Sequence, residues 1–136
     1  MNNEEEKYKT LQKAISRLEE AVEEATQNTT LTNAVREMLR DSIIQRFEFT
    51  LELAWKYLRT VLINQSILPQ DVSSPKKTIR EAFKGGTITN GHIWIDMLDD
   101  RNLLSHTYNQ EDSIKIEQNI ISTYLPELKS IKKEKW

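Results

Sequence analysis

The stretch RNLLSHTY, residues 101–108, holds side chains that could act on a phosphodiester. An imidazole has a pKa of about 6.5, so His106 could move a proton to or from a 2′-hydroxyl or a leaving oxygen at neutral pH. A guanidinium presents a fixed fork of donors, so Arg101 could hold two phosphate oxygens as charge builds on them. The chemistry that these residue types could perform together is cleavage of RNA without a metal ion.

The spacing of these groups restricts how they can meet. In an ideal helix Tyr108 lies only about 20° from Arg101, whereas His106 lies about 140° away. Arg101 and His106 can therefore act on one ligand if the helix ends near Ser105, or if they meet counterparts across a dimer axis. The residues alone leave open a second interpretation. It is a histidine stabilised by the helix dipole, beside an arginine paired with an aspartate of the same helix: Asp96, Asp99 or Asp100.

Composition limits the partners. The chain has 19 Lys and Arg against 21 Asp and Glu, and its net charge of −2 excludes a generally basic RNA-binding protein. It has no cysteine, which excludes disulfides and thiolate sites. The N-terminal MNNEEEKYK is unlike a signal peptide, and no apolar run approaches the roughly 18 residues of a membrane span. We expect a cytoplasmic protein with no membrane segment, no metal site and no cofactor.

The elements that position the motif are expected to be helices, because three glycines and three prolines are too few for a β protein with many turns. Ser74 and Pro75 are typical of a helix start, and Gly85-Gly86 of a helix end. Pro126 should kink or interrupt the last helix, which follows the polar NQED turn. Apolar spacings of three and four predict helices at about 4–26, 31–64 and 91–106.

These elements predict one all-α domain over residues 1–136, a five-helix up-and-down bundle with short connections. The core should span about 4–128, and the basic tail 129–136 should be frayed. The tail KSIKKEKW carries four lysines against one glutamate.

The long helix predicted over 31–64 is apolar on more than one side, so it should pack centrally or meet a second subunit. One row runs through Phe47, Leu51 and Trp55, and a second through Phe49, Leu53 and Tyr57. Glu48 and Glu52 share a face, but no set of metal ligands accompanies them. We expect them to face solvent or pair with basic neighbours, of which Arg46 and Lys56 are the obvious ones.

The short helix after Pro75 carries a row of basic residues. A row of this kind could guide an RNA backbone or an acidic partner surface, although a solvated face is the default. His92 lies at a helix start and should be a surface residue. The row comprises Lys76, Lys77, Arg80 and Lys84.

The octapeptide resembles the R-x4-H-x-Y signature of HEPN-domain proteins, in which a polar residue usually follows the arginine, as Asn102 does here. The resemblance extends to three blocks in order: QRFEFTLELAWKYL (45–58), SPKKTIREAFKGG (74–86) and WIDMLDDRNLLSHTY (94–108). They are similar to the HEPN subgroup called nucleotidyltransferase substrate-binding proteins, which is related to the toxin subunits called HepT. The resemblance covers about residues 4–128 and is far more specific than the octapeptide alone.

The resemblance implies a homodimeric five-helix bundle paired with a small, separate nucleotidyltransferase. In toxin members of the family, the arginine and histidine cleave RNA, and the tyrosine accepts AMP from the partner, which silences the toxin. Carried over to this chain, Arg101 and His106 would be catalytic, Asn102 supporting and Tyr108 the acceptor. The family name leaves open a second role, that of a non-catalytic subunit that binds substrate for the nucleotidyltransferase.

Overall fold

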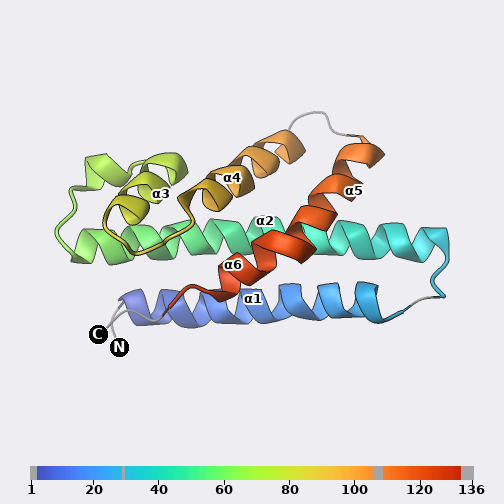
Figure 1. The fold of residues 1–136 in the computed structure, drawn as a ribbon. Coiled ribbons are helices and arrows are strands. Elements are labelled where there is room, and N and C mark those ends of the chain that lie inside the picture. Colours follow the sequence, from blue (N-terminus) through green and yellow to red (C-terminus); the bar gives the residue numbers. More distant parts are fainter. Residues whose placement is uncertain (1–2, 29, 106–108, 133–136) are drawn as a thin grey trace.

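The structure, a computed structural model, describes residues 3–28, 30–105 and 109–132, and every regular element among them is helical (Figure 1). The all-α five-helix bundle expected from the sequence is confirmed, with the last helix divided into three parts. The elements are α1 (Asn3–Gln27), α2 (Asn33–Asn64), the 3₁₀ turn η1 (Pro69–Val72), α3 (Pro75–Lys84), α4 (Gly91–Ser105), α5 (Gln110–Asn119), the π-helical segment η2 (Ile120–Tyr124) and α6 (Leu125–Lys129).

The long helices α1 and α2 run antiparallel, and the rest of the chain packs around this pair (Figure 1). Helices α3 and α4 lie on the side of α2 that faces away from α1. The α5–η2–α6 segment then crosses the pair, contacting α2 through α5 and α1 through α6. This crossing encloses a core to which every helix contributes.

Polar side chains fix where the helices begin. Thr32 and Ser74 each accept a hydrogen bond from the backbone N–H three residues on, at 3.2 Å, and so cap α2 and α3. Asn109 caps α5 in the same way at 2.8 Å. Helix α3 ends at the predicted glycine pair, and the φ of +79° at Gly86 is one that glycine adopts without a Cβ penalty.

Pro126 alters the helix that precedes it. Proline has no N–H to donate, and its ring crowds the carbonyl four residues back. The segment Ile120–Tyr124 is π-helical, and the Leu125 N–H bonds to the carbonyl of Ile120, five residues back. The predicted interruption of the last helix is confirmed as this π segment, which separates α5 from α6.

One buried carboxylate ties α6 to the start of α4. Glu127 accepts a hydrogen bond from the indole N–H of Trp94 at 3.0 Å through one oxygen, and from the amide of Asn90 at 2.9 Å through the other. Both Trp94 and Glu127 are buried, so the bond between them satisfies polar atoms that water does not reach. The two bonds to Glu127 fix which face of α4 points inward.

Helix α2 is central, as its two apolar rows predict. Phe47, Leu51 and Tyr57 are fully buried, and Phe47 stacks on Tyr124 of η2 with ring centroids 5.4 Å apart. Three large apolar side chains of α2 instead face outward, since Met38 is 68%, Phe49 is 61% and Val35 is 40% exposed. No helix in the described part of the chain is long and apolar enough to cross a membrane.

Candidate functional site

Arg101 of the motif reaches from α4 to α2. It follows the buried Trp94 by seven residues, and two turns of helix return it to nearly the same inward face. Its Nη2 lies 3.2 Å from Oε2 of Glu52, and its side chain remains 33% exposed. The interpretation that paired this arginine with an aspartate of its own helix is therefore wrong. The guanidinium bridges two helices and still reaches solvent.

The neighbouring Asp100 points to a different element. It accepts a hydrogen bond from the Tyr124 hydroxyl at 2.6 Å and another from the Asn119 amide at 3.2 Å. Burial raises the pKa of Tyr124, and the bond to Asp100 and the charge of Asp100 raise it further, so the phenol stays protonated. Consecutive residues of α4 are thus held by different elements, Asp100 by α5 and η2 and Arg101 by α2, which fixes the rotation of the helix.

Glu52 gathers three donors around one carboxylate. Its Oε2 also accepts from the Trp55 indole N–H at 3.1 Å, and its Oε1 lies 3.2 Å from the ammonium of Lys56. Partial burial alone would raise the pKa of Glu52, but the bonds from Trp55 and Lys56 and the charge of Arg101 outweigh it and lower the pKa. Glu52 is therefore ionised at neutral pH, and its expected pairing with Lys56 is confirmed.

Glu48 lies one turn before Glu52 and also faces Arg101. Partial burial raises the pKa of Glu48, and the positive charge of Arg101 offsets part of the rise. The expectation that Arg46 would pair with these carboxylates is wrong. Arg46 lies toward α1, where its Nη1 donates to the backbone carbonyl of Arg17 at 2.6 Å.

Glu52 holds the guanidinium in place more than it stabilises the fold. An ion pair that is about one-third exposed contributes little to the free energy of unfolding, because water screens it. The Glu52 contact uses one terminal nitrogen, and a guanidinium has five N–H donors, so donors remain for a phosphate. Because Glu48 and Glu52 would repel an anion, a phosphate would approach Arg101 from its exposed side.

The second half of the motif, His106 and Tyr108, lies outside the described residues, so the predicted separation of Arg101 and His106 remains a prediction. Its flanks are described. Ser105 is the last residue of α4, and Asn109 is the extended N-cap of α5. Asn102 is exposed on α4. Among the described residues, no cluster of His, Asp and Glu is arranged to hold a metal ion.

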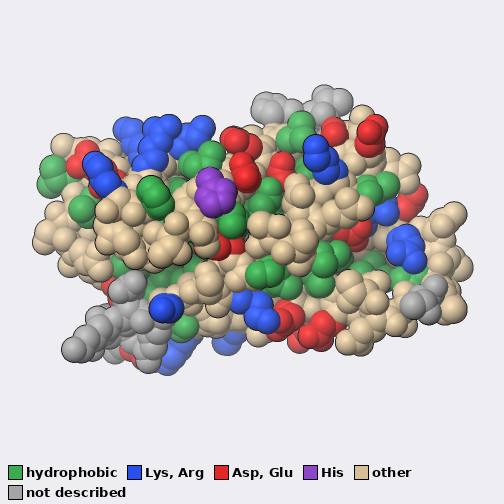
Figure 2. Space-filling model, viewed as in Figure 1, with side chains coloured by type: hydrophobic (Ala, Val, Ile, Leu, Met, Phe, Trp, Pro, Cys, Tyr) green, Lys and Arg blue, Asp and Glu red, His purple; other side chains and the backbone are tan. Residues whose placement is uncertain are grey.

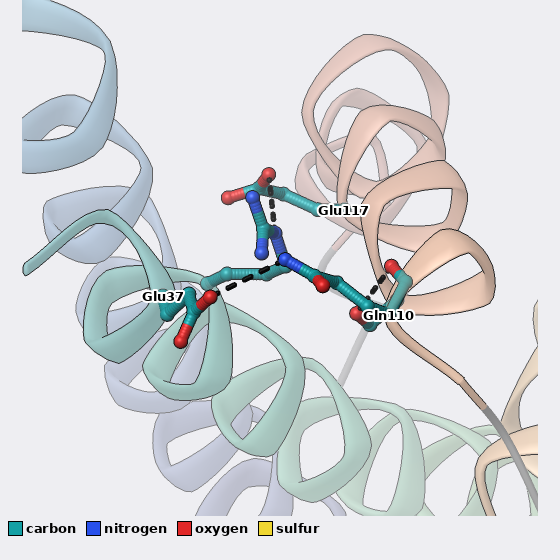
Figure 3. Close-up of polar contacts among 5 residues, drawn as sticks. Glu37, Gln110 and Glu117 are labelled. Atoms are coloured by element: carbon teal, nitrogen blue, oxygen red, sulfur yellow. Dashed lines mark hydrogen bonds and ion pairs between the residues drawn. The ribbon is translucent and has the colours of Figure 1, made fainter. Parts of the chain in front are cut away.

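Helix α5 is anchored to α2 near both of its ends by polar contacts that the sequence patterns did not indicate (Figure 3). The buried Arg40 donates from Nε to Oε1 of Glu117 at 3.3 Å, and the Gln110 amide donates to Glu37 at the same distance. A hollow of about 370 Å³ lies between the two helices here, and Asn109 is part of its wall. The chain thus contacts α2 at Gln110, two residues after Tyr108.

The two described flanks of the motif therefore contact one side of α2. Glu37, which meets α5, and Glu52, which meets Arg101, are fifteen residues apart and differ by only about 60° around the helix. Along α2 they are separated by about 22 Å. Glu37 and Glu52, both distant in sequence from the motif, thus contact the residues on either side of His106 and Tyr108. Their spacing alone could not have identified them as its neighbours.

Comparison with known proteins agrees with this fold. Residues 6–135 match the family model described as nucleotidyltransferase substrate binding protein like. The chain is 34% identical over 84 residues to a probable ribonuclease HepT of Haemophilus influenzae, a match that covers 60% of this chain and 58% of that protein. The match therefore spans less than two-thirds of that relative's length.

A crystal structure of a protein from Thermus thermophilus superimposes with a TM-score of 0.68 and 28% identity, covering 89% of this chain and 94% of the other. The fold is thus shared over nearly the whole of both chains. The family match extends over the same helices that hold Arg101 and Glu52. The chain belongs to the nucleotidyltransferase substrate-binding protein family, the HepT-like group of HEPN bundles.

Proposed function

We propose that this chain is the RNA-cleaving HEPN subunit of a two-protein system, in which a small nucleotidyltransferase binds and modifies it. The observation that carries the proposal is the placement of Arg101. Its guanidinium is held by Glu52, reaches solvent and lies on the helix that leads directly to His106. A guanidinium held in a fixed orientation can stabilise charge on a phosphate without reorganising during the reaction.

The proposed reaction uses the 2′-hydroxyl of RNA as its nucleophile. His106 accepts the 2′-hydroxyl proton, the 2′-oxygen forms a bond to the adjacent phosphorus, and the bond from phosphorus to the 5′-oxygen breaks. The leaving oxygen takes a proton from water or from the second imidazole of a dimer. The products are a 2′,3′-cyclic phosphate and a 5′-hydroxyl. Arg101 holds the phosphate oxygens on which negative charge accumulates.

The alternative is a non-catalytic subunit that binds substrate for the nucleotidyltransferase, a binding role in keeping with the family description, nucleotidyltransferase substrate binding protein like. Expression of the chain without its partner separates the two proposals. If the chain is a ribonuclease toxin, the wild type arrests growth and degrades cellular RNA, and His106→Ala does neither. If cellular RNA stays intact when either the wild type or His106→Ala is expressed, the substrate-binding subunit is the better description.

Modification by the partner is proposed to fall on Tyr108. The phenol oxygen would form a bond to the α-phosphorus of a nucleoside triphosphate, pyrophosphate would leave, and the phenol proton would pass to solvent. An unperturbed phenol has a pKa of about 10 and is a poor general base at neutral pH, which argues against a catalytic role. A nucleotide added there would bring a bulky anion to the motif and occupy the phosphate site of Arg101.

Tyr108→Phe should keep RNase activity within about threefold of wild type and make it insensitive to the partner, because only the acceptor oxygen is lost. RNA cleavage would be measured before and after incubation with the nucleotidyltransferase and ATP, with mass spectrometry to detect the added nucleotide. His106→Ala is the matched control, since it should be inactive yet still modified. A Tyr108→Phe protein as inactive as His106→Ala would place the tyrosine in the chemistry instead.

A homodimer is proposed as the working assembly. The exposed Met38 and Phe49 lie within about 20° of each other around α2, next to the side on which Glu52 holds Arg101. Pairing α2 with its counterpart would cover these two apolar side chains and bring two copies of the motif together. We expect a dimer by light scattering at micromolar concentration, and a monomer after Phe49→Glu. A monomeric wild type would contradict the proposal.

A further inference from the structure

The outward face of α3 is basic. Lys76, Arg80 and Lys84 follow one another at spacing four, and with Lys77 they occupy an arc of about 100°. All four side chains are exposed, while Thr78, Ile79 and Ala82 form the buried face of the same helix. The sole acidic residue of α3, Glu81, lies at the edge of the arc. Figure 2 shows Lys and Arg side chains gathered over α3.

This concentration of positive charge on α3 contrasts with the net charge of −2 of the whole chain. Helix α1 provides the comparison, because its exposed basic residues 9, 13 and 17 have the same spacing and composition as residues 76, 80 and 84. On α1, however, glutamates share the arc, and Lys9 pairs with Glu5 at 3.6 Å. On α3 Lys84 lies 3.7 Å from Glu81, which leaves three cations of the arc without an ion pair among the described residues.

An aromatic ring lies at the edge of the basic face. Phe83 is 55% exposed and lies about 20° around α3 from Lys76. One side of the ring covers Gly91 so closely that a Cβ at Gly91 would come within 2.9 Å of it. The base of the side chain is therefore supported by the backbone of α4, while more than half of the side chain is exposed and could stack on a nucleobase.

We infer that this basic face, formed by Lys76, Lys77, Arg80 and Lys84 with Phe83 at its edge, binds the backbone of single-stranded RNA. The inference rests on the proposed function and extends it, because it assigns a binding surface outside the motif. Three of the four cations are lysines, a residue depleted at protein interfaces but effective in contacting phosphates. Regularly spaced cations with no carboxylate inside their arc fit a repeating anion better than a protein surface.

Binding can be measured apart from cleavage with a fluorescein-labelled, 2′-O-methylated RNA 20-mer, which has no nucleophile. Fluorescence anisotropy from 50 to 200 mM NaCl gives both the affinity and its salt dependence. Each phosphate contact contributes about 0.7 to the slope of log affinity against log salt for a single strand. We expect the triple variant Lys76→Gln, Arg80→Gln, Lys84→Gln to bind at least about tenfold more weakly, with a slope lower by about 2.

The matched control is the triple variant Lys9→Gln, Lys13→Gln, Arg17→Gln, which removes the same residue types at the same spacing and changes the net charge equally. It should bind within about twofold of wild type. Phe83→Ala should weaken binding without changing the salt slope, because stacking releases no counterions. Circular dichroism would show that all variants are folded.

Three results would overturn the inference: no salt-dependent binding by the wild type, equal losses in the two triple variants, or wild-type affinity in the α3 variant. An α3 variant that keeps its RNA affinity but no longer binds the nucleotidyltransferase would assign the face to a protein partner. Cleavage of ordinary RNA by the same proteins reports on the proposed function separately. A wild type that binds RNA without cutting it would contradict the ribonuclease proposal but not the inference that the basic face of α3 binds RNA.

Discussion

Replacing Arg101 with alanine will slow RNA cleavage by about 10²–10³-fold and leave the stability of the protein nearly unchanged. The guanidinium is the group proposed to stabilise charge on the phosphate, so its loss removes an interaction that is strongest in the transition state. Its ion pair with Glu52 is about one-third exposed and contributes little to folding. Initial cleavage rates of a defined RNA and thermal unfolding curves would be measured on the same preparations.

Two further variants show whether position as well as charge matters. Arg101→Lys keeps the charge but loses the planar fork, and it should recover only part of the lost activity. Glu52→Gln keeps an oxygen that can accept from Arg101 but removes the charge that holds it, so activity should fall less than in Arg101→Ala. An Arg101→Ala protein that cleaves RNA at the wild-type rate would remove this residue from the mechanism.

Replacing Glu127 with alanine will lower the free energy of unfolding by about 2–4 kcal/mol, because the buried indole N–H of Trp94 loses its partner. The indole N–H of Trp94 and the amide of Asn90 both donate to this carboxylate, and Trp94 is fully buried. Water cannot reach the indole N–H to replace the bond. Urea denaturation followed by tryptophan fluorescence and circular dichroism would measure the change.

Glu127→Gln is the matched control. Its amide oxygen can still accept from Trp94, while its NH₂ group would then face the other donor, the amide of Asn90. It should lose less stability than Glu127→Ala. If Glu127→Ala unfolds at the same urea concentration as the wild type, this carboxylate does not fix α6 to α4.

The helical architecture could be predicted because local signals and long-range packing agree. Ser74-Pro75 starts α3 and Gly85-Gly86 ends it, and both signals act through the backbone of the residues concerned. The burial of Phe47 and Leu51 followed from helical periodicity. The kind of interruption at Pro126 did not, because proline can kink a helix, end it or be preceded by a π segment, and packing selects among these outcomes.

The partners of polar residues were predicted less well, because they depend on how helices are placed. The sequence suggested that Arg101 could pair with an aspartate of its own helix, yet its partner is Glu52, which lies 49 residues earlier. One sequence signal was present. Arg101 follows Trp94 by seven residues, and a long side chain on the inward face of α4 must meet a neighbouring helix. Arg46 was misassigned for the same reason, since the position of α1 was not specified by the pattern.

Metal-independent RNA cleavage through His106 is tested most directly with the purified chain, a defined RNA and excess EDTA. We predict that the wild type cleaves under these conditions and leaves a 2′,3′-cyclic phosphate, because the nucleophile is part of the RNA. His106→Ala should be slower by at least about 10²-fold, the contribution typical of a positioned proton-transfer group. Cleavage that EDTA abolishes and Mg²⁺ or Mn²⁺ restores, or an undiminished rate in His106→Ala, would contradict the proposed mechanism.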